Sequence, residues 1–353
     1  MHRYFFLNKL KLFFLTLVVL ITLSGCTESK TVSESHLEEP MASIYNSLPV
    51  LKSKDVIIAM VPKSLDNPVF LDAKEEGERV GRKLGIKVEW LGSMQTDSDE
   101  QKAIVESLIR RQVDGILISC IDPQKMKPVI NKAIEAGIKV ATFDSDSPGS
   151  DRMFYCGSNN YAAGEACGKA LIKVLQTKKL GERELNLLIM TADEGSYNLN
   201  ERLRSFKDAA EKGGIKLRVI DTLYCKDDIN LAGDILEKYM RTNEDVDVFF
   251  STGGWPLIVP PESMPGFRAW CKAGGTSIVV DTFYPIVDAA KKGMADALVG
   301  QNFKKMGELS IKNLYSAIQG EQIYSKFIDT GLELGDKTNY DLLLKGKQRW
   351  EIK

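Results

Sequence analysis

The strongest constraint on the fold of this chain is a repeated alternation of short apolar runs with amphipathic helical stretches. The first example is 55–85, where Val56 to Val61 is almost continuously apolar, as in a strand buried on both faces of a parallel sheet. Asn67 then precedes Pro68, which is the order of a helix N-cap followed by proline in the first turn. The segment predicts a β-loop-α unit, and in open α/β sheets ligands bind beside such loops.

The same unit recurs along the chain and divides it into two similar halves, the second of which starts after 153–157. Further strands are expected at 86–91, 114–119, 139–143, 185–190, 216–221, 246–251, 278–281 and 297–301. Helices are expected at 98–112, 124–136, from 160, at 198–212, 228–240 and through 292, and four prolines predict a partly irregular connection within 255–270. We therefore predict an α/β fold of two similar lobes, each a doubly wound parallel sheet.

The first 25 residues have the features of a secretory signal peptide. Three basic residues precede an apolar run of twelve, Leu12 to Leu23, which is well short of the ~20 residues of a membrane-spanning helix. The run ends in Leu23-Ser24-Gly25-Cys26, which resembles the bacterial lipobox, whose cysteine is acylated and becomes the mature N-terminus. We expect a protein of the periplasm or cell surface, anchored through a lipid on Cys26, with 26–54 as a polar flexible tether. An ordinary secretory peptide is the alternative.

Composition excludes several other classes of protein. After residues 1–25 the chain has 44 lysines and arginines against 48 acidic residues, a net charge of -4, so we expect no nucleic-acid partner. His2 and His36 precede the predicted fold, which excludes Ser-His-Asp catalysis and a histidine metal site, and no cofactor or metal is expected. Five further cysteines form no close pairs and are expected to be buried thiols, with a Cys120–Cys156 bridge as an alternative.

The export signal, the two α/β halves and several short motifs together resemble type I periplasmic sugar-binding proteins, the ribose-binding-like group that serves ABC importers. The resemblance covers about 55–334 and rests on Asn67-Pro68-Val69-Phe70 and on Asp144, Asp281 and Gln301 at strand ends. It implies two lobes joined by a three-stranded hinge, with 55–157 plus 302–327 in the first lobe. The second lobe would contain 158–301 plus 328–353. Residues 303–326 would form a helix that returns to the first lobe. The protein is expected to be a monomer.

The resemblance assigns ligand-binding roles to the matching residues. Asn67 would hydrogen-bond a sugar hydroxyl, Phe70 would stack on the ring, and Asp144 would accept hydroxyl protons. Asp281 and Gln301 would bind from the second lobe and the hinge. Carboxylates, amides and aromatic rings complement a sugar, which offers many donors and an apolar face. Each residue also has a structural alternative, as a helix cap, a core aromatic or a turn former.

Five further candidates depart from the family's pattern or match it weakly. Ser119 stands where the family often has a ligand-binding asparagine, and Trp255 follows two glycines that let the backbone approach a ligand. Asp146 stands beside Asp144 without the expected arginine, and Asn200 replaces a ligand arginine while Arg202 is retained. These changes remove positive charge, so we expect a neutral or cationic ligand in place of a phosphorylated or acidic sugar.

The functional hypothesis is a solute-binding lipoprotein, not an enzyme, that delivers a sugar or sugar-like ligand to an ABC transporter permease. A ligand-sensing receptor component with the same fold, for chemotaxis, a quorum signal or a kinase, is the alternative. A glycosidase using only the carboxylates of Asp144 and Asp281 has no further support in the sequence. A repressor is disfavoured because the chain opens with an export signal and lacks an N-terminal helix-turn-helix.

Overall fold

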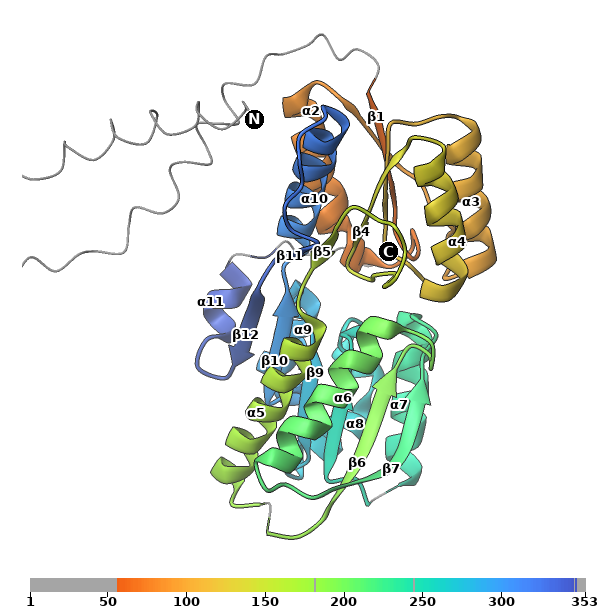
Figure 1. Cartoon of the computed structure of the whole chain (residues 1–353). Coiled ribbons are helices and arrows are strands. Elements are labelled where there is room, and N and C mark those ends of the chain that lie inside the picture. The colour runs from red at the N-terminus through yellow and green to blue at the C-terminus, as the bar shows by residue number, and fades with distance from the viewer. Residues whose placement is uncertain (1–55, 181, 244, 346, 348–353) are drawn as a thin grey trace, which may run out of the picture. The chain divides into compact units, whose positions relative to one another are not determined.

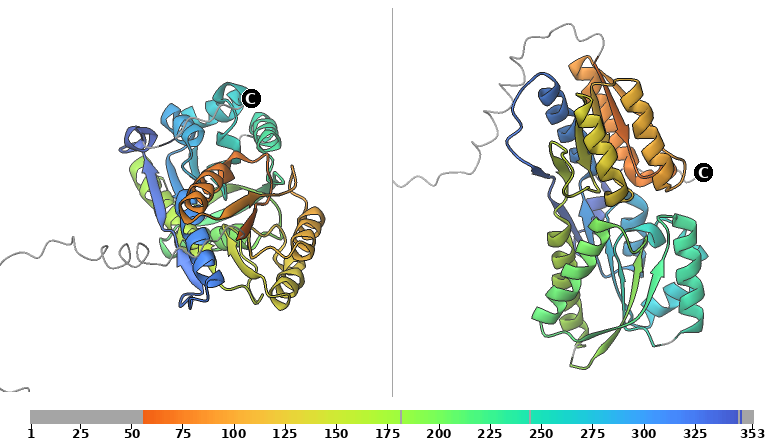
Figure 2. Two further views of the ribbon diagram at one scale, coloured as in Figure 1. Left: turned by 90° about the horizontal axis from the view of Figure 1, so that it is seen from above. Right: turned by 45° about the vertical axis from the view of Figure 1, so that its right-hand side comes forward.

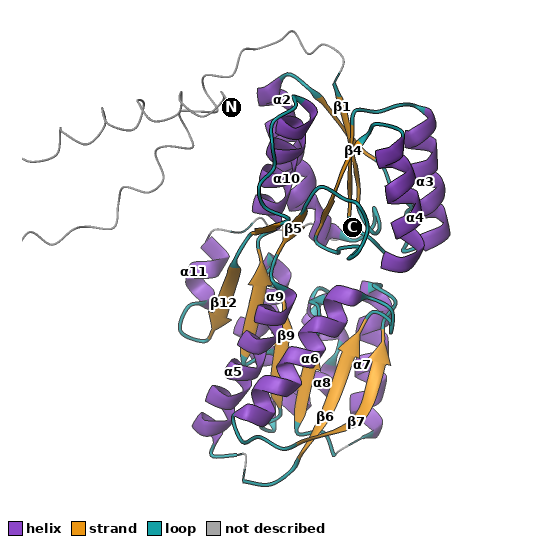
Figure 3. Ribbon diagram, viewed as in Figure 1, coloured by secondary structure: helices purple, strands orange, loops and turns teal. Residues whose placement is uncertain are grey.

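The computed structural model describes residues 56–180, 182–243, 245–345 and 347. The predicted signal peptide, its lipobox and the tether lie outside these residues. Within the described part of the chain, no helix is both long and apolar enough to cross a membrane. Two six-stranded sheets, each with helices on both faces, account for the fold (Figures 1 and 3). The predicted α/β class with two similar doubly wound lobes is therefore confirmed.

The first sheet is parallel throughout and has the strand order β11-β5-β4-β3-β1-β2. Its strands are β1 (Ile57–Val61), β2 (Lys87–Trp90), β3 (Gly115–Ile118), β4 (Lys139–Phe143), β5 (Tyr155–Gly157) and β11 (Phe327–Asp329). Its helices are α2 (Leu71–Leu84), α3 (Ser98–Arg110), α4 (Pro123–Glu135) and α10 (Phe303–Ile318). α2 packs with α10 on one face and α3 with α4 on the other, so α10 returns to the first lobe (Figure 2).

The second sheet has the order β12-β10-β9-β8-β6-β7, with only β12 antiparallel to its neighbour. Its strands are β6 (Leu185–Thr191), β7 (Leu217–Tyr224), β8 (Val248–Ser251), β9 (Thr276–Val280), β10 (Ala297–Gln301) and β12 (Leu332–Asp336). Its helices are α5 (Asn160–Lys178), α6 (Tyr197–Lys212), α7 (Ile229–Thr242), α8 (Pro265–Lys272), α9 (Tyr284–Ala289) and α11 (Tyr340–Lys345). The proline-rich segment forms two 3₁₀ turns, after which α8 begins at Pro265.

The chain passes between the two sheets after β5, after β10 and after β11. The third crossing was expected near 327–328, but Phe327 to Asp329 still pair with β5. The change of sheet lies at Thr330 and Gly331, where Gly331 has a φ of 76°, a backbone conformation that favours glycine. The helix expected over 303–326 also ends earlier, at Ile318, because Gly320 adopts a φ of 87° shortly after it.

The five cysteines of the described chain are free thiols. Cys120, Cys156, Cys167 and Cys225 are buried and Cys271 is half-buried. Burial raises the pKa of each thiol, that of Cys156 and that of Cys271 to about 12. These residues pack as small apolar side chains.

Close contact between α5 and α6 positions the helix that carries Arg202. Gly164 and Gly168 lie one turn apart on α5, and a Cβ at Gly164 would come within 2.0 Å of the carbonyl oxygen of Arg202. At Gly168 it would meet the Ala209 side chain at 2.6 Å and the Phe206 carbonyl oxygen at 2.8 Å. The backbones of the two helices therefore approach as closely as they do only because both positions lack a side chain.

We predict that Gly164→Ala lowers the free energy of unfolding by about 1–3 kcal/mol, although alanine favours helix, because the added methyl group overpacks the helix contact. Glu165→Ala is the control, since Glu165 lies on the exposed face of α5, and its effect should stay within about 0.5 kcal/mol. Urea unfolding followed by circular dichroism measures both. A Gly164→Ala protein as stable as the parent would contradict the packing argument.

Candidate ligand-binding site

Three aspartates at the carboxyl ends of strands point their side chains at one cavity. Asp144 follows β4, Asp281 follows β9 and Asp227 follows β7, and their φ angles are 55°, 84° and 61°. A left-handed backbone costs an L-residue roughly 1–2 kcal/mol, so it persists only where the surroundings impose it. β4 and β9 occupy equivalent places in the two sheets. Asp144 and Asp281 are thus a matched pair from the two lobes.

The cavity lies between the lobes and has a volume of about 30 Å³, which is room for about two water molecules. It is lined by Lys63, Asn67, Val69, Phe70, Asp144, Asn198, Leu199, Arg202, Asp227, Gly253, Gly254, Trp255, Asp281, Gln301 and Phe303. Seven of the ten predicted ligand residues are therefore in its wall: Asn67, Phe70, Asp144, Arg202, Trp255, Asp281 and Gln301. A sugar fits only if the lobes move apart, which the three crossings between the sheets allow.

Arg202 organises the second-lobe side of the cavity. Each nitrogen of the guanidinium donates one hydrogen bond: Nε to Asn160 Oδ1 at 2.8 Å, Nη1 to the Thr252 carbonyl at 2.9 Å and Nη2 to Gln301 Oε1 at 2.7 Å. Gln301 Nε2 in turn donates to Asp281 Oδ1 at 3.0 Å. Arg202 is 2 % exposed and does not pair with a helix-face glutamate. Gln301 thus links Arg202 to Asp281, and the positive charge of Arg202 partly compensates the cost of burying the Asp281 carboxylate.

Asp281 is held entirely by its own lobe. Besides Gln301, the backbone N–H of Gly254 donates to Oδ2 at 3.1 Å. Burial raises the pKa of this carboxyl, while the charge of Arg202 and the two hydrogen bonds act in the opposite direction. The residue is thus positioned by the β8 loop and by the hinge strand β10 before any ligand arrives.

On the first-lobe side, Ser119 positions Asp144 and does not reach the cavity itself. Ser119 Oγ donates to Asp144 Oδ2 at 2.7 Å, and the serine is completely buried. Asp144 lines the cavity, and its Oδ1 receives no hydrogen bond from the described residues. Ser119 therefore orients the carboxylate of Asp144, one of the predicted ligand-binding residues.

The Asn67 turn has both of the roles that the sequence left open. Asn67 Oδ1 caps the 3₁₀ turn Pro68–Phe70 by accepting from the Val69 N–H at 3.2 Å, while Nδ2 donates to Asp227 Oδ1 at 3.4 Å, and both residues line the cavity. Phe70 lines the cavity and also packs edge-on against Phe143 and Phe303, with ring centroids 6.4 and 5.9 Å apart. Capping, packing and lining are thus combined in four residues.

Besides Ser119, two further candidates from the sequence lie outside the cavity, Asp146 and Asn200, so neither lines the site as expected. Asp146 accepts hydrogen bonds from Thr142 and forms an ion pair with Arg152, so its charge is neutralised within the first lobe. Asn200 is exposed and donates to the Glu194 carbonyl at 2.8 Å. Because Asn198 is four residues before Arg202 on α6, these two share a face, and Asn200 between them points away.

Asp227 and Phe303 are lining residues that sequence reasoning missed, whereas Lys63 begins the loop 63–70 after β1, where the sequence predicts ligand contact. Lys63 follows β1 and Asp227 follows β7, which extends to Tyr224, whereas the sequence placed the end of that strand at 221. Burial raises the pKa of Asp227 to about 6, against the effects of Lys63 and of the Trp255 hydrogen bond. A position shortly after a strand was the available signal, but the sequence predicts that strand to end at 221, well before Asp227.

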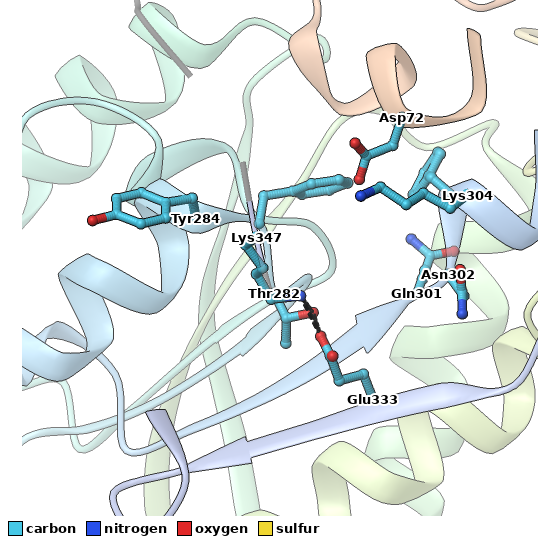
Figure 4. A pocket seen from close by; sticks show the side chains of 10 residues that line it. Asp72, Thr282, Tyr284, Gln301, Asn302, Lys304, Glu333 and Lys347 are labelled. Carbon is cyan, nitrogen blue, oxygen red and sulfur yellow. Dashed lines mark hydrogen bonds and ion pairs between the residues drawn. The ribbon is translucent and has the colours of Figure 1, made fainter. Parts of the chain in front are cut away.

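A second cavity of about 200 Å³ lies beside the hinge and shares Gln301 and Phe303 with the first (Figure 4). Thr282 and Lys347 both hydrogen-bond Glu333 at its base. The Phe303 ring also packs on Phe283 at 5.5 Å between centroids. Within the described residues, no group of His, Cys, Asp or Glu is arranged to hold a metal ion.

Comparison with known proteins gives the family. Residues 58–322 match the model of the periplasmic binding protein domain, which is most of the folded chain. The chain belongs to the periplasmic binding protein family. The ribose import binding protein RbsB of Bacillus subtilis is 24% identical over 285 residues, covering 80% of this chain and 87% of the relative. A D-ribose/D-allose-binding protein of Pseudomonas aeruginosa is 26% identical over 57% of this chain and 60% of its own.

Solved structures of this family have the same architecture. A solute-binding protein of an ABC transporter from Burkholderia graminis, solved in complex with D-arabinose, is 30% identical with a TM-score of 0.73. The two chains are covered to 81% and 96%. The glucose-galactose binding protein GanP of Geobacillus stearothermophilus is 24% identical with a TM-score of 0.72, covering 80% of this chain and 98% of its own. The type I fold expected from the sequence motifs is confirmed.

We predict that Arg202→Met lowers the free energy of unfolding by at least about 2 kcal/mol, because it leaves three buried acceptors and the Asp281 carboxylate without their cation. Arg204→Met is the matched control on the same helix, since Arg204 pairs with Glu201 at the surface, and it should change stability by less than about 0.5 kcal/mol. Chemical denaturation compares the two. Equal effects would show that the Arg202 network does not stabilise the lobe.

Proposed function

We propose that this protein is an extracytoplasmic solute-binding lipoprotein that binds a neutral or cationic sugar or sugar-like ligand between its lobes. It delivers that ligand to an ABC transporter permease. The observation that carries the proposal is the convergence of Asn67, Phe70, Asp144 and Asp281, from both lobes, on one cavity beside the hinge. The names of the relatives, which include a ribose import binding protein and a D-arabinose complex, support it.

The chemistry of the cavity wall suits a polyhydroxylated ligand. The Oδ1 of Asp144, which receives no hydrogen bond from the described residues, accepts hydroxyl or ammonium protons, while the amide groups of Asn67 and Asn198 provide both donors and acceptors. Phe70 and Trp255 offer flat apolar surfaces for the carbon face of a ring. Hydrogen bonds to charged acceptors are the stronger ones, so the aspartates would discriminate between hydroxyl patterns.

The balance of charges decides which sugars are favoured. Three acidic side chains, of Asp144, Asp227 and Asp281, line the cavity with two cationic ones, Lys63 and Arg202, and each nitrogen of Arg202 already donates a hydrogen bond within its lobe. A phosphate or carboxylate on the ligand would add a charge that this wall repels in a buried setting. A neutral sugar or an amino sugar would bring no negative charge into the cavity.

The location and partners follow from the sequence and the family. Cys26 would carry the lipid, 26–54 would tether the lobes at the membrane surface, and the monomer would present its ligand-bound form to the permease. Catalysis is not proposed, because the relatives are named as binding proteins and the fold lacks histidine.

We predict that a thermal-shift screen against pentoses, hexoses, deoxysugars, polyols and amino sugars finds one class that raises the melting temperature. A ligand at a hundred times its dissociation constant adds about 2.7 kcal/mol of stability. Asp144→Asn and Asp281→Asn should abolish the shift, whereas Asp228→Asn, which alters only the cap of α7, should keep it. A shift given only by acidic sugars, or by a non-carbohydrate, would contradict the proposed ligand class.

We predict that cells supplied with labelled palmitate incorporate it into the wild-type protein and not into Cys26→Ser. The reason is that the lipobox cysteine is the only residue at the predicted cleavage site that can form a thioether to the lipid. Fractionation should move the variant from the membrane to the soluble fraction. A label retained by Cys26→Ser would contradict anchoring at this cysteine.

A further inference from the structure

An apolar groove of about 530 Å³ lies on the second lobe, between α5 on one side and β10, β12 and the turn after β12 on the other. It shares no lining residue with the cavity that contains Asp144 and Asp281, nor with the cavity beside the hinge. Small-molecule sites in proteins have volumes of about 300–1,000 Å³. The groove is therefore large enough for a ligand of its own.

The edge of the second sheet forms the floor of this groove. β12 is the outermost strand, next to β10, and α5 packs across β9 and β10 (Figure 1). A Cβ at Gly335 would meet Leu343 and Tyr340 of α11, and side chains alternate along a strand, so Leu334 points to the opposite face. Leu334 is 59 % exposed there, although it pairs in register with the buried Val299 of β10. An apolar strip of β10 and β12 thus faces α5 across an open groove.

The wall on the α5 side consists of small aliphatic residues. Ala166, Ala170 and Val174 follow one another at intervals of one turn and all line the groove. No aromatic side chain of the described residues is in the wall. Aromatic faces suit a flat ring, whereas methyl and methylene groups offer only non-directional apolar contact. The lining therefore favours a flexible alkyl chain over a sugar or an aromatic ligand.

The end of the groove away from the hinge, where β12 ends beside the start of β10, carries more positive than negative charge. Three lysines and two aspartates line it there: Lys173, Lys178, Lys337, Asp296 and Asp336. Lys178 Nζ donates to Asp296 Oδ2 at 3.0 Å, and Lys173 Nζ donates to Asp336 Oδ2 at 3.1 Å. Each aspartate is thus already paired with one lysine, which leaves Lys337 as the excess cation.

Lys337 is the group with which an anionic ligand would pair. Its Nζ is 3.5 Å from Asp296 Oδ1, which is longer than an ordinary hydrogen bond, and 70 % of its side chain is exposed. An exposed pair of this kind contributes little to stability. A ligand carboxylate can therefore take Lys337 as its partner while the Lys178–Asp296 pair stays intact.

We propose that this groove is a second binding site and that it takes a fatty acid. The carboxylate pairs with Lys337, and the alkyl chain runs toward the hinge between Leu334 and the two alanines of α5. An ammonium head group would add to the excess positive charge and is disfavoured. The site is independent of the sugar proposed for the cleft, because the two sites share no residue.

The groove touches every element by which the second lobe enters the hinge. α5 begins after the first crossing between the lobes, β10 ends before the second and β12 begins after the third. A fatty acid in the groove therefore contacts all three elements at once.

The test is calorimetric titration of the full chain carrying Cys26→Ser, purified without detergent so that no other amphiphile competes. The probes are dodecanoate and dodecylammonium, each below its critical micelle concentration. We expect one dodecanoate site per chain, with an affinity about tenfold or more above that for dodecylammonium, which has the same chain and the opposite charge. Lys337→Gln should reduce this preference. Equal affinities for the two probes would contradict the proposal.

Two variants and one control locate the site. Leu334→Asp should weaken dodecanoate binding about tenfold or more, because it places a charge where the chain lies. Ala170→Leu should weaken it similarly by filling the groove, whereas non-specific adsorption to an apolar surface would survive this change. Leu342→Asp is the control, since Leu342 is 70 % exposed on α11 and does not line the groove. Circular dichroism checks the folding of each variant, and Ala170→Leu keeps the test valid if Leu334→Asp does not fold.

Other occupants of the groove give different results. Dodecanoate binding that is unchanged in both Leu334→Asp and Ala170→Leu would overturn the proposal. So would an absence of dodecanoate binding, including the case in which the chain binds only phosphatidylglycerol vesicles. A dimer in sedimentation velocity that Leu334→Asp converts to a monomer would show that a second copy of the chain covers the groove, and would also overturn it.

Discussion

The buried guanidinium of Arg202 is the interaction on which the candidate site depends. It joins α5 through Asn160, the end of β8 through Thr252 and the hinge strand β10 through Gln301, so one side chain ties together the elements around the second-lobe half of the cavity. Gln301, held by Arg202, in turn donates a hydrogen bond that positions the Asp281 carboxylate. The close packing of α5 on α6 places Arg202 at the required depth, because two glycines bring the helices together.

The two lobes prepare the site in different ways. The first lobe orients Asp144 through Ser119 and Asn67 through its cap, whereas the second holds Asp281 and Asp227 by bonds that remain when the lobes separate. Each lobe is therefore ordered before closure, and a ligand contributes only the difference between the open and the closed contacts. Preorganisation of this kind lowers the entropic cost of binding.

Most of the fold could be predicted from the sequence, because apolar strands and amphipathic helices alternate with clear periods. The site residues at strand ends were accessible for the same reason: Asp144 and Asp281 follow strands whose ends are marked by the change from apolar to polar residues. Asn200 was chosen from the resemblance of its motif, but helical geometry places Asn198, four residues before Arg202, on the face that lines the cavity. The contacts of Asp227 with Asn67 and Thr96 cross between the lobes, and no local pattern in a sequence encodes such a contact.

The measurement that tests the central claim most directly is native mass spectrometry of the protein purified from cells grown on mixed carbohydrates. The account predicts one non-covalent adduct per chain, with the mass of a neutral or amino sugar, that is lost when Asp144 and Asp281 are both changed to asparagine. An adduct that survives in this double variant, or one with the mass of an acidic ligand, would contradict a neutral or cationic sugar held between the two lobes.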